Sequence, residues 1–131
     1  CWGKDVLGSI GSPDENYFPP RVVKGLSDAV QVACSRSTTC AVVQGGNVWC
    51  WGSNSAGQLG DGTEDDDRHP LPVKVGDLEG VVRLRAGDAS FCALLHDGSM
   101  RCWGDNSDAE LGIGPADDAP HAPVSPSFGP P

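Results

Sequence analysis

Six cysteines are the residues of this 131-residue chain whose chemistry constrains it most. An even number of cysteines can form a metal site or a set of disulfides. The chain has no C-x-x-C pair, and its three histidines, His69, His96 and His121, lie far apart with no ligand spacing between them. The pattern therefore predicts disulfides rather than a structural zinc site. Disulfides in turn predict an oxidising compartment, so we expect a secreted or cell-surface protein.

The remaining reactive groups suggest no catalytic chemistry. The order of residues supports no Ser-His-Asp or Cys-His constellation, and a bridged sulfur is no nucleophile. The glycine-rich stretches do not lead into a helix, so no phosphate-binding loop is expected. The sequence therefore predicts a chain that is not an enzyme and that carries no cofactor and no metal.

Acidic side chains form the other notable clusters. Carboxylates in short runs can bind calcium, but their spacing here matches no twelve-residue calcium loop. We therefore favour solvated loops that contact a partner, and a calcium-dependent adhesin or cell-surface structural protein is the alternative. The candidate binding acids are Asp61, Glu64, Asp65, Asp66, Asp67, Asp117 and Asp118.

The overall charge and hydropathy exclude some partners. A formal net charge of −9 disfavours nucleic acid and anionic membrane surfaces as partners. No apolar run approaches the ~20 residues that cross a bilayer, so no membrane span is expected. The sequence opens directly on a motif that recurs later, so we expect that an export signal has been removed or that the sequence is an excerpt.

The elements that must position these residues recur about every fifty residues. Cys-Trp-Gly occurs at Cys1, Cys50 and Cys102, at intervals of 49 and 52 residues. Each copy is followed by glycine-rich elements, a proline-flanked extended segment, a β-branched strand and a hairpin. Four short strands per unit are typical of a propeller blade. We therefore predict an all-β fold of antiparallel four-stranded β-propeller blades, with about two and a half repeats and an incomplete ring.

The repeat boundaries predict one domain rather than several. Repeat 1 covers residues 1–49 and begins late in a blade, repeat 2 covers 50–101, and partial repeat 3 covers 102–131. Blades bury their faces against neighbours, so two and a half of them leave faces uncovered. We expect all three to belong to one propeller or propeller fragment, within a longer chain or an assembly.

The hairpins themselves predict two disulfides. Residues 44–46 and 96–98 fit three-residue loops, in which a type I turn ends on a glycine in the left-handed region. Counting outward from either loop places two cysteines in a non-hydrogen-bonded pair, with Cα atoms about 4.5 Å apart. That separation suits a disulfide. The two predicted bridges are Cys40–Cys50 and Cys92–Cys102.

Two cysteines are left over. Cys1 stands at the second-cysteine position of a hairpin, and Cys34 falls where the next copy has Ala86. A Cys1–Cys34 bridge is the simplest way to use both. The alternative is that the partner of Cys1 was lost when the chain was cut.

The tryptophans divide into two kinds. Trp2, Trp51 and Trp103 occupy a fixed repeat position, which predicts a place in the core between blades. Trp49 lies on the opposite hairpin face and is replaced by Arg101 in the next copy. Trp49 is therefore the candidate for an exposed aromatic contact.

The combined motifs resemble a known repeat. Cys/Trp-Gly, Asn-x-x-Gly-Gln-Leu-Gly-x-Gly and Pro-x-Val, followed by Cys-Ala-Leu and Asp-Gly, resemble the regulator of chromosome condensation repeat over nearly the whole chain. The resemblance implies a propeller of about seven blades that binds proteins. The family includes an exchange factor for a small GTPase, domains of ubiquitin ligases and secreted bacterial inhibitors of β-lactamase. The paired cysteines resemble the exported bacterial branch.

The sequence thus predicts a non-catalytic scaffold that binds a protein partner. The binding loops are expected at residues 12–19, 59–70 and 111–120, where the copies differ most. Inhibition of an enzyme, in the manner of the β-lactamase inhibitors, is a second alternative.

Overall fold

The computed structural model describes residues 1–5, 7–12 and 17–127, which form an all-β chain with no helix. Alternating apolar residues and frequent glycines favour short strands joined by tight turns. The strands are β1 (Gly3–Lys4), β2 (Tyr17–Phe18), β3 (Ala29–Cys34), β4 (Thr38–Val43), β5 (Val48–Asn54), β6 (Asp65–Lys74), β7 (Val81–Ala86), β8 (Ser90–Leu95) and β9 (Met100–Gly104).

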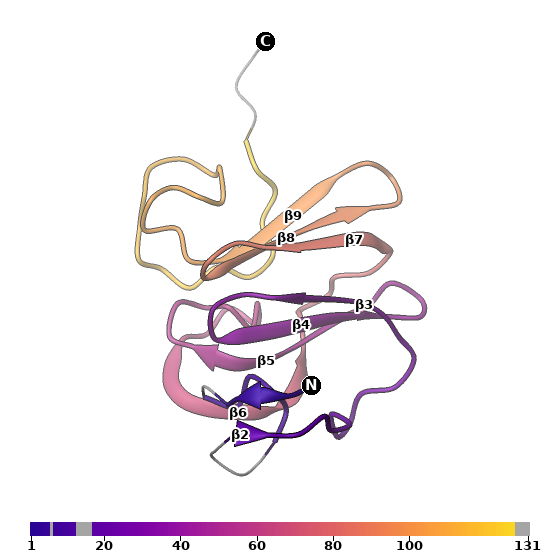
Figure 1. Ribbon diagram of the computed structural model, residues 1–131. Coiled ribbons are helices and arrows are strands. Elements are labelled where there is room, and N and C mark those ends of the chain that lie inside the picture. The colour runs from indigo at the N-terminus through magenta and orange to yellow at the C-terminus, as the bar shows by residue number, and fades with distance from the viewer. Residues whose placement is uncertain (6, 13–16, 128–131) are drawn as a thin grey trace.

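These strands form three antiparallel sheets that are stacked in chain order (Figure 1). The first sheet is β1–β2, the second is β3–β4–β5–β6, and the third is β7–β8–β9. Val124 extends the third sheet, because its backbone exchanges two hydrogen bonds of 2.8 Å with Cys102. The second sheet therefore has the four strands that the repeat predicts, and the third has three strands with a bridge to Val124 at the fourth position.

The hairpin registers agree with the sequence count. Cys40 lies opposite Cys50, and Cys92 lies opposite Cys102. The last loop residue is left-handed in both hairpins, with φ of 82° at Gly46 and 85° at Gly98. The predicted type I turn is wrong for the first hairpin, because φ of Gly45 is +96°, as at the third residue of a type II turn. The second central residue is glycine in this loop and Asp97 in the other, which explains the difference.

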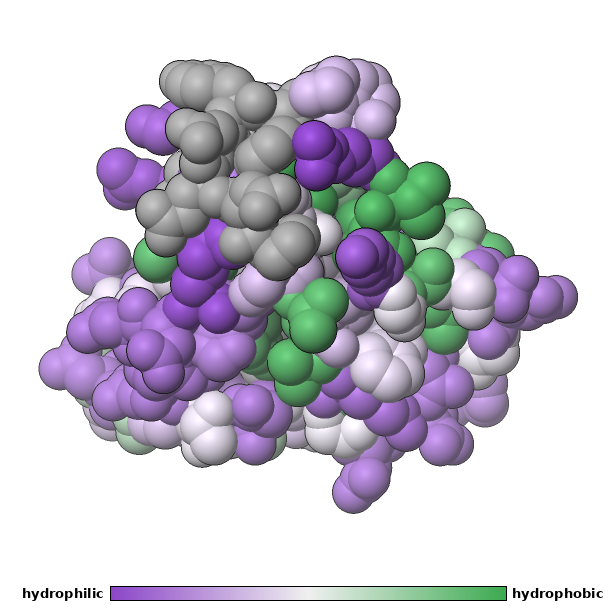
Figure 2. Space-filling model, turned by 90° about the horizontal axis from the view of Figure 1, so that it is seen from below, coloured by the Kyte–Doolittle hydropathy of each residue, from purple (hydrophilic) through white to green (hydrophobic). Residues whose placement is uncertain are grey.

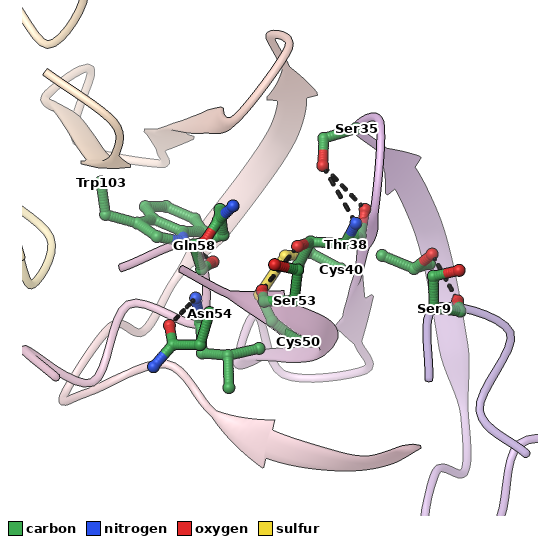
Figure 3. The surroundings of a disulfide bond; sticks show 11 residues. Ser9, Ser35, Thr38, Cys40, Cys50, Ser53, Asn54, Gln58 and Trp103 are labelled. Carbon is green, nitrogen blue, oxygen red and sulfur yellow. Dashed lines mark hydrogen bonds between the residues drawn. A yellow bond between two sulfur atoms is a disulfide. The ribbon is translucent and has the colours of Figure 1, made fainter. Parts of the chain in front are cut away.

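The main core fills the boundary between the two larger sheets. Cys40, Val42, Val48 and Cys50 present one apolar strip from β4 and β5, and each is at most 2% exposed. On the opposite side, the rings of Phe91 and Trp103 stack with centroids 5.8 Å apart. The loop residues Leu59, Val75 and Leu78 complete this cluster. Figure 3 shows Trp103 beside Gln58, whose carbonyl accepts the indole hydrogen bond at 3.0 Å.

The sheets are offset from the sequence repeats. The second sheet runs from Ala29 to Lys74. Its outer strand, β6, lies after the Cys-Trp-Gly motif at Cys50, where sequence repeat 2 has already begun. Each fifty-residue unit of sequence is consequently shared by two neighbouring sheets. Neighbouring sheets are therefore joined by the polypeptide itself as well as by side-chain packing.

The part of the chain that the structure describes has no helix with the length and apolar character needed to cross a membrane.

Candidate functional site

The candidate site is a pair of acidic segments that occupy equivalent places in consecutive sheets. Residues 60–70 join β5 to the body of β6, and residues 112–120 follow β9 in the same way. Asp65, Asp66 and Asp67 lie at the start of β6 rather than in a free loop. Six of the seven predicted acids are exposed, and Asp65 is half-buried. The predicted segment 12–19 lies partly outside the described residues, because it includes 13–16.

A buried asparagine anchors the first acidic segment. Asn54 ends β5 and is 1% exposed. Its side-chain amide donates to Thr63 O at 3.1 Å and to Asp65 Oδ2 at 3.3 Å. Its Oδ1 accepts the backbone N–H of Leu59 at 3.1 Å. One side chain therefore links Leu59, just before the segment, to Thr63 and Asp65 within it.

A second asparagine repeats this arrangement in the next sheet. Asn106 is also 1% exposed. Its amide donates to Asp117 Oδ2 at 3.0 Å, and its Oδ1 accepts the N–H of Leu111 at 3.2 Å. In the N-terminal segment Asp5 takes this position: its Oδ1 accepts the N–H of Ile10 at 3.0 Å. The carboxylate of Asp5 also pairs with Arg68, which joins the first acidic segment to the preceding unit.

A histidine completes each anchor. His69 Nε2 lies 2.7 Å from Asp65 Oδ1, and His121 Nε2 lies 2.7 Å from Asp117 Oδ1. The hydrogen bond with His69 holds the pKa of Asp65 below its ordinary value, and Asn54 and the Asp67 N–H act in the same direction. The pKa of Asp117 is lowered in the same way, first by His121. Each acidic segment is thus fixed by an Asn–Asp–His chain of hydrogen bonds.

The sequence interpretation missed the role of these histidines, because it considered them only as metal ligands. A signal for them was present, because Asp65–His69 and Asp117–His121 share the same four-residue spacing in equivalent segments. Paired residues at one spacing in two copies indicate a shared contact.

Two of the remaining acids, Glu64 and Asp118, line a cleft between the two segments. The cleft has a volume of about 320 Å³ and is lined on one side by Glu64 and on the other by Asp105, Asp117 and Asp118. Asp61 accepts hydrogen bonds from Thr63 N at 2.9 Å and Thr63 Oγ1 at 2.6 Å, so it shapes its own turn. Asp66 and Asp67 are exposed on β6. In the described residues, no group of three or more His, Cys, Asp or Glu side chains could hold a metal ion.

The tryptophans differ partly from the predictions. Trp51 and Trp103 are buried between units, at 1% and 0% exposure, as predicted. The prediction is wrong for Trp2, which is 72% exposed. Trp49 is half-buried between β4 and β6, so it is not the exposed aromatic that was expected. A role for Trp49 in binding stays a prediction.

The cysteines form two disulfides. Cys40–Cys50 and Cys92–Cys102 are bonded, each with a Cα–Cα distance of 4.1 Å. The predicted Cys1–Cys34 bridge is absent, and both thiols are free. Cys34 ends β3 with its side chain exposed, whereas Cys1 lies against Arg21 through backbone hydrogen bonds of 2.8 Å.

Stacked antiparallel sheets, repeated cysteine hairpins and asparagine-anchored loops define this chain as a β-propeller repeat protein. Models of the Regulator of chromosome condensation (RCC1) repeat match it at residues 29–58 and 81–109, and at 45–94. The chain belongs to the RCC1 repeat family.

Known proteins are similar to this chain over most of its length. The human E3 ubiquitin-protein ligase HERC2 is 36% identical over 119 residues, which are 86% of this chain and 2% of the ligase. The ultraviolet-B receptor UVR8 of Arabidopsis thaliana is 31% identical over 122 residues, which are 90% of this chain and 28% of the receptor.

Solved structures share the fold. Prp20p of Saccharomyces cerevisiae superposes with a TM-score of 0.78 at 18% identity, over 97% of this chain and 33% of Prp20p. Human WBSCR16 gives a TM-score of 0.78 at 25% identity, over 97% of this chain and 34% of that protein. The chain thus spans about a third or less of the length of these four proteins. RCC1 repeat propellers are generally non-catalytic.

Proposed function

We propose that this chain is a non-catalytic, disulfide-stabilised scaffold of an exported protein, and that its two acidic segments bind a protein partner. The observation that carries the proposal is the repeated anchor, Asn54–Asp65–His69 and Asn106–Asp117–His121. Binding residues concentrate on loops that a rigid scaffold holds in place.

The anchors leave the outward acids available for contact. Asp66 and Asp118 are exposed, whereas Asp65 and Asp117 are engaged within the anchors. Glu64 and Asp118 face one cleft from consecutive segments. Clustered negative charge steers a partner of opposite charge and raises the association rate, with an effect that weakens as salt increases. We therefore expect the partner to present lysine or arginine at this face.

Related proteins support a binding role. Prp20p is described by its binding to Gsp1p and histones, and a second structure holds Kap60 bound to yeast RCC1. The family therefore offers precedent for contacts between proteins, made by a propeller of the same fold.

The two disulfides support export, because bridges of this kind rarely persist in a reducing cytosol. Thiol alkylation before lysis, followed by non-reducing peptide mapping, tests this part. Bridged Cys92 and Cys102 in the cell envelope or growth medium are the expected result. Free thiols there, or a reduced protein in the cytosol, would contradict it.

The binding proposal is tested with a double charge reversal, Asp66→Lys with Asp118→Lys. The matched control is Asp77→Lys with Glu79→Lys, which alters the net charge equally at exposed acids outside the two segments. Each protein is immobilised and exposed to the native growth medium, and bound proteins are quantified by mass spectrometry. We expect a specific partner to be retained by the wild type and the control and lost from the double variant.

Unchanged melting temperatures confirm that the variants differ in binding and not in folding. Equal retention by both variants would place the contact elsewhere. The β-lactamase-inhibitor alternative is a special case of the same binding, and an inhibition assay with purified β-lactamase separates it.

A further inference from the structure

The two anchor histidines bring a titrating group into each acidic segment. Imidazole gains or loses its proton between about pH 5 and pH 8, where carboxylates and lysine keep their charge. The side chains of His69 and His121 are 27% and 16% exposed, so water reaches both rings. Each ring lies 2.7 Å from an aspartate of its own segment. The charge of both segments therefore depends on pH through the same kind of contact.

The hydrogen bond of each histidine is compatible with both protonation states. A neutral ring with its proton on Nε2 donates to the aspartate, and the charged ring donates from the same nitrogen. The aspartates accept in either case, because hydrogen bonds, first those from the histidines, hold the pKa values of Asp65 and Asp117 below their ordinary value. A proton gained by the ring thus changes the charge of a segment and leaves the contact that positions it in place.

The surroundings of His69 combine charges from two elements. The charged residues near it are Asp5 of the N-terminal segment and Asp65, Asp67 and Arg68 of β6. Asp5 and Arg68 pair with each other. The neighbouring elements otherwise meet His69 through their backbone: Gly52 of β5 lies opposite it, and the Leu7 carbonyl accepts its N–H at 3.3 Å. Asp65 is therefore the charge that the His69 ring contacts.

The surroundings of His121 are acidic. The turn of residues 55–58 approaches it through the backbone, since a Cβ atom on Gly57 would lie 3.3 Å from the His121 nitrogen. The charged side chains that line the adjoining cleft are Glu64, Asp105, Asp117 and Asp118. Among the described residues, no lysine or arginine lines this cleft. A proton on His121 therefore adds positive charge to a negative site.

The surface near β6 offers a partner charge more than apolar contact. β6 lies toward the lower side of the molecule in Figure 1. The view from below shows hydrophilic side chains over much of that side, around a smaller group of hydrophobic ones (Figure 2). Attraction between opposite charges weakens when one of the two surfaces loses part of its charge.

We propose that His69 and His121 make the binding of a cationic partner dependent on pH, so that the partner is held at neutral pH and released on acidification. The inference rests on the proposed binding function of the acidic segments. Each protonated ring adds one positive charge to its segment, and the anchors keep their geometry. The regulation therefore acts through charge and needs no movement of the loops.

The test measures the affinity of a fluorescent octalysine peptide by anisotropy at low ionic strength, about 50 mM, where screening is weak. Lysine stays charged throughout, so a change in affinity reports on the protein. Between about pH 7.5 and about pH 5.5 we expect the wild type to lose about fivefold in affinity, the repulsion of two added charges at several ångströms in water.

Three histidines supply the variants. His69→Gln with His121→Gln places at each site an amide that donates a hydrogen bond and does not titrate, so the affinity should no longer change with pH. The matched control is His96→Gln, because His96 is exposed in the β8–β9 hairpin loop, outside both segments. This control should keep the pH dependence of the wild type.

The outcomes separate the regulation from the binding function. Octalysine binding whose pH dependence is equal in the wild type and the double variant would overturn the regulation and leave the binding function standing. A wild type that binds no octalysine at either pH would contradict the binding function, and the regulation with it.

Amide resonances test whether charge acts alone. The N–H groups of Leu59 and Leu111 bond to the anchor asparagines and should keep their protection from exchange across this pH range. Loss of that protection at low pH would show that the segments rearrange, and this would overturn a mechanism based on charge.

Discussion

Two boundaries of the molecule carry the same repeat positions and differ in how they are filled. Between the second and third sheets, Leu84 and Trp103 are 1% and 0% exposed, and Phe91 stacks on Trp103. Between the N-terminal segment and the second sheet, Val32 is 59% exposed and an apolar groove stands open. The difference lies in what covers the surface: among the described residues, the first boundary has a complete hairpin over it, and the second has none.

This contrast separates the formation of the hairpins from the burial of their side chains. Local pattern alone forms the hairpins, since both have the same registry whether or not a neighbour covers them. Burial depends on the next unit, as expected for an array in which each repeat contacts its neighbours. Hairpin geometry is therefore a property of one unit, and core packing is a property of a pair.

The largest effect is expected for Trp103→Ala. Removal of a fully buried indole leaves a cavity and costs about 3–5 kcal/mol of unfolding free energy. The same change at Trp2, which is 72% exposed, should alter it by no more than about 0.5 kcal/mol. Urea unfolding followed by circular dichroism measures both. Similar losses for the two variants would mean that Trp2 and Trp103 are equally packed, which would contradict the difference between the two boundaries.

The next largest effect on stability is expected when either disulfide is removed. Each closes a short loop with a sequence separation of 10, so loop entropy gives both at most about 3 kcal/mol. Cys40 and Cys50 are 0% exposed in the filled boundary, whereas Cys92 is half-buried on the far face of the third sheet. The double alanine variant of Cys40 and Cys50 should therefore lose more stability than that of Cys92 and Cys102. Thermal melts of the two variants, run beside each other, measure the difference, and the reverse order would contradict it.

The hairpins were predictable from sequence because their information is local. Loop length and the αL glycine fix the register, so both disulfides followed from counting. The turn type of the first loop was not fixed, because Gly45 has access to both signs of φ. The exposure of Trp2 was missed because a repeat position indicates core only where the neighbouring unit is present.

The candidate site was only half predictable. Variable acidic segments were recognisable from the differences between copies, and the asparagines from their place in the repeat motif. The partners of Asp65 and Asp117 were not, because hydrogen bonds across a loop depend on its path. The free thiols of Cys1 and Cys34 were misassigned because the choice of bridge was made by elimination rather than by geometry.

The anchors should behave alike at both sheets. Asn54→Ala leaves the buried N–H of Leu59 without its acceptor, and Asn106→Ala does the same to Leu111. Each variant should lose about 1–3 kcal/mol, the cost of an unsatisfied buried donor. Chemical denaturation measures the loss, and amide hydrogen exchange locates it in the acidic segments. A large difference between the two variants would show that the anchors are not equivalent.

The smallest effect is expected from pH. The hydrogen bonds with His69 and His121 lower the pKa values of Asp65 and Asp117, so the folded state holds these protons more weakly than the unfolded state. The resulting stability is present above the unfolded pKa of about 4 and is lost as pH falls through the lower folded values. The double variant His69→Ala, His121→Ala removes the main cause of both shifts. The difference in melting temperature between wild type and this variant should therefore narrow as pH falls from about 6 to about 2. The pKa of Asp97 is also lowered, first by its hydrogen bond with Ser99. The double variant leaves this contact in place, so the contribution of Asp97 is the same in both proteins and cancels from the difference in melting temperature. A gap in melting temperature that stays constant over this range would show that the histidines hold the segments by packing alone, and the two anchors would then be steric rather than electrostatic.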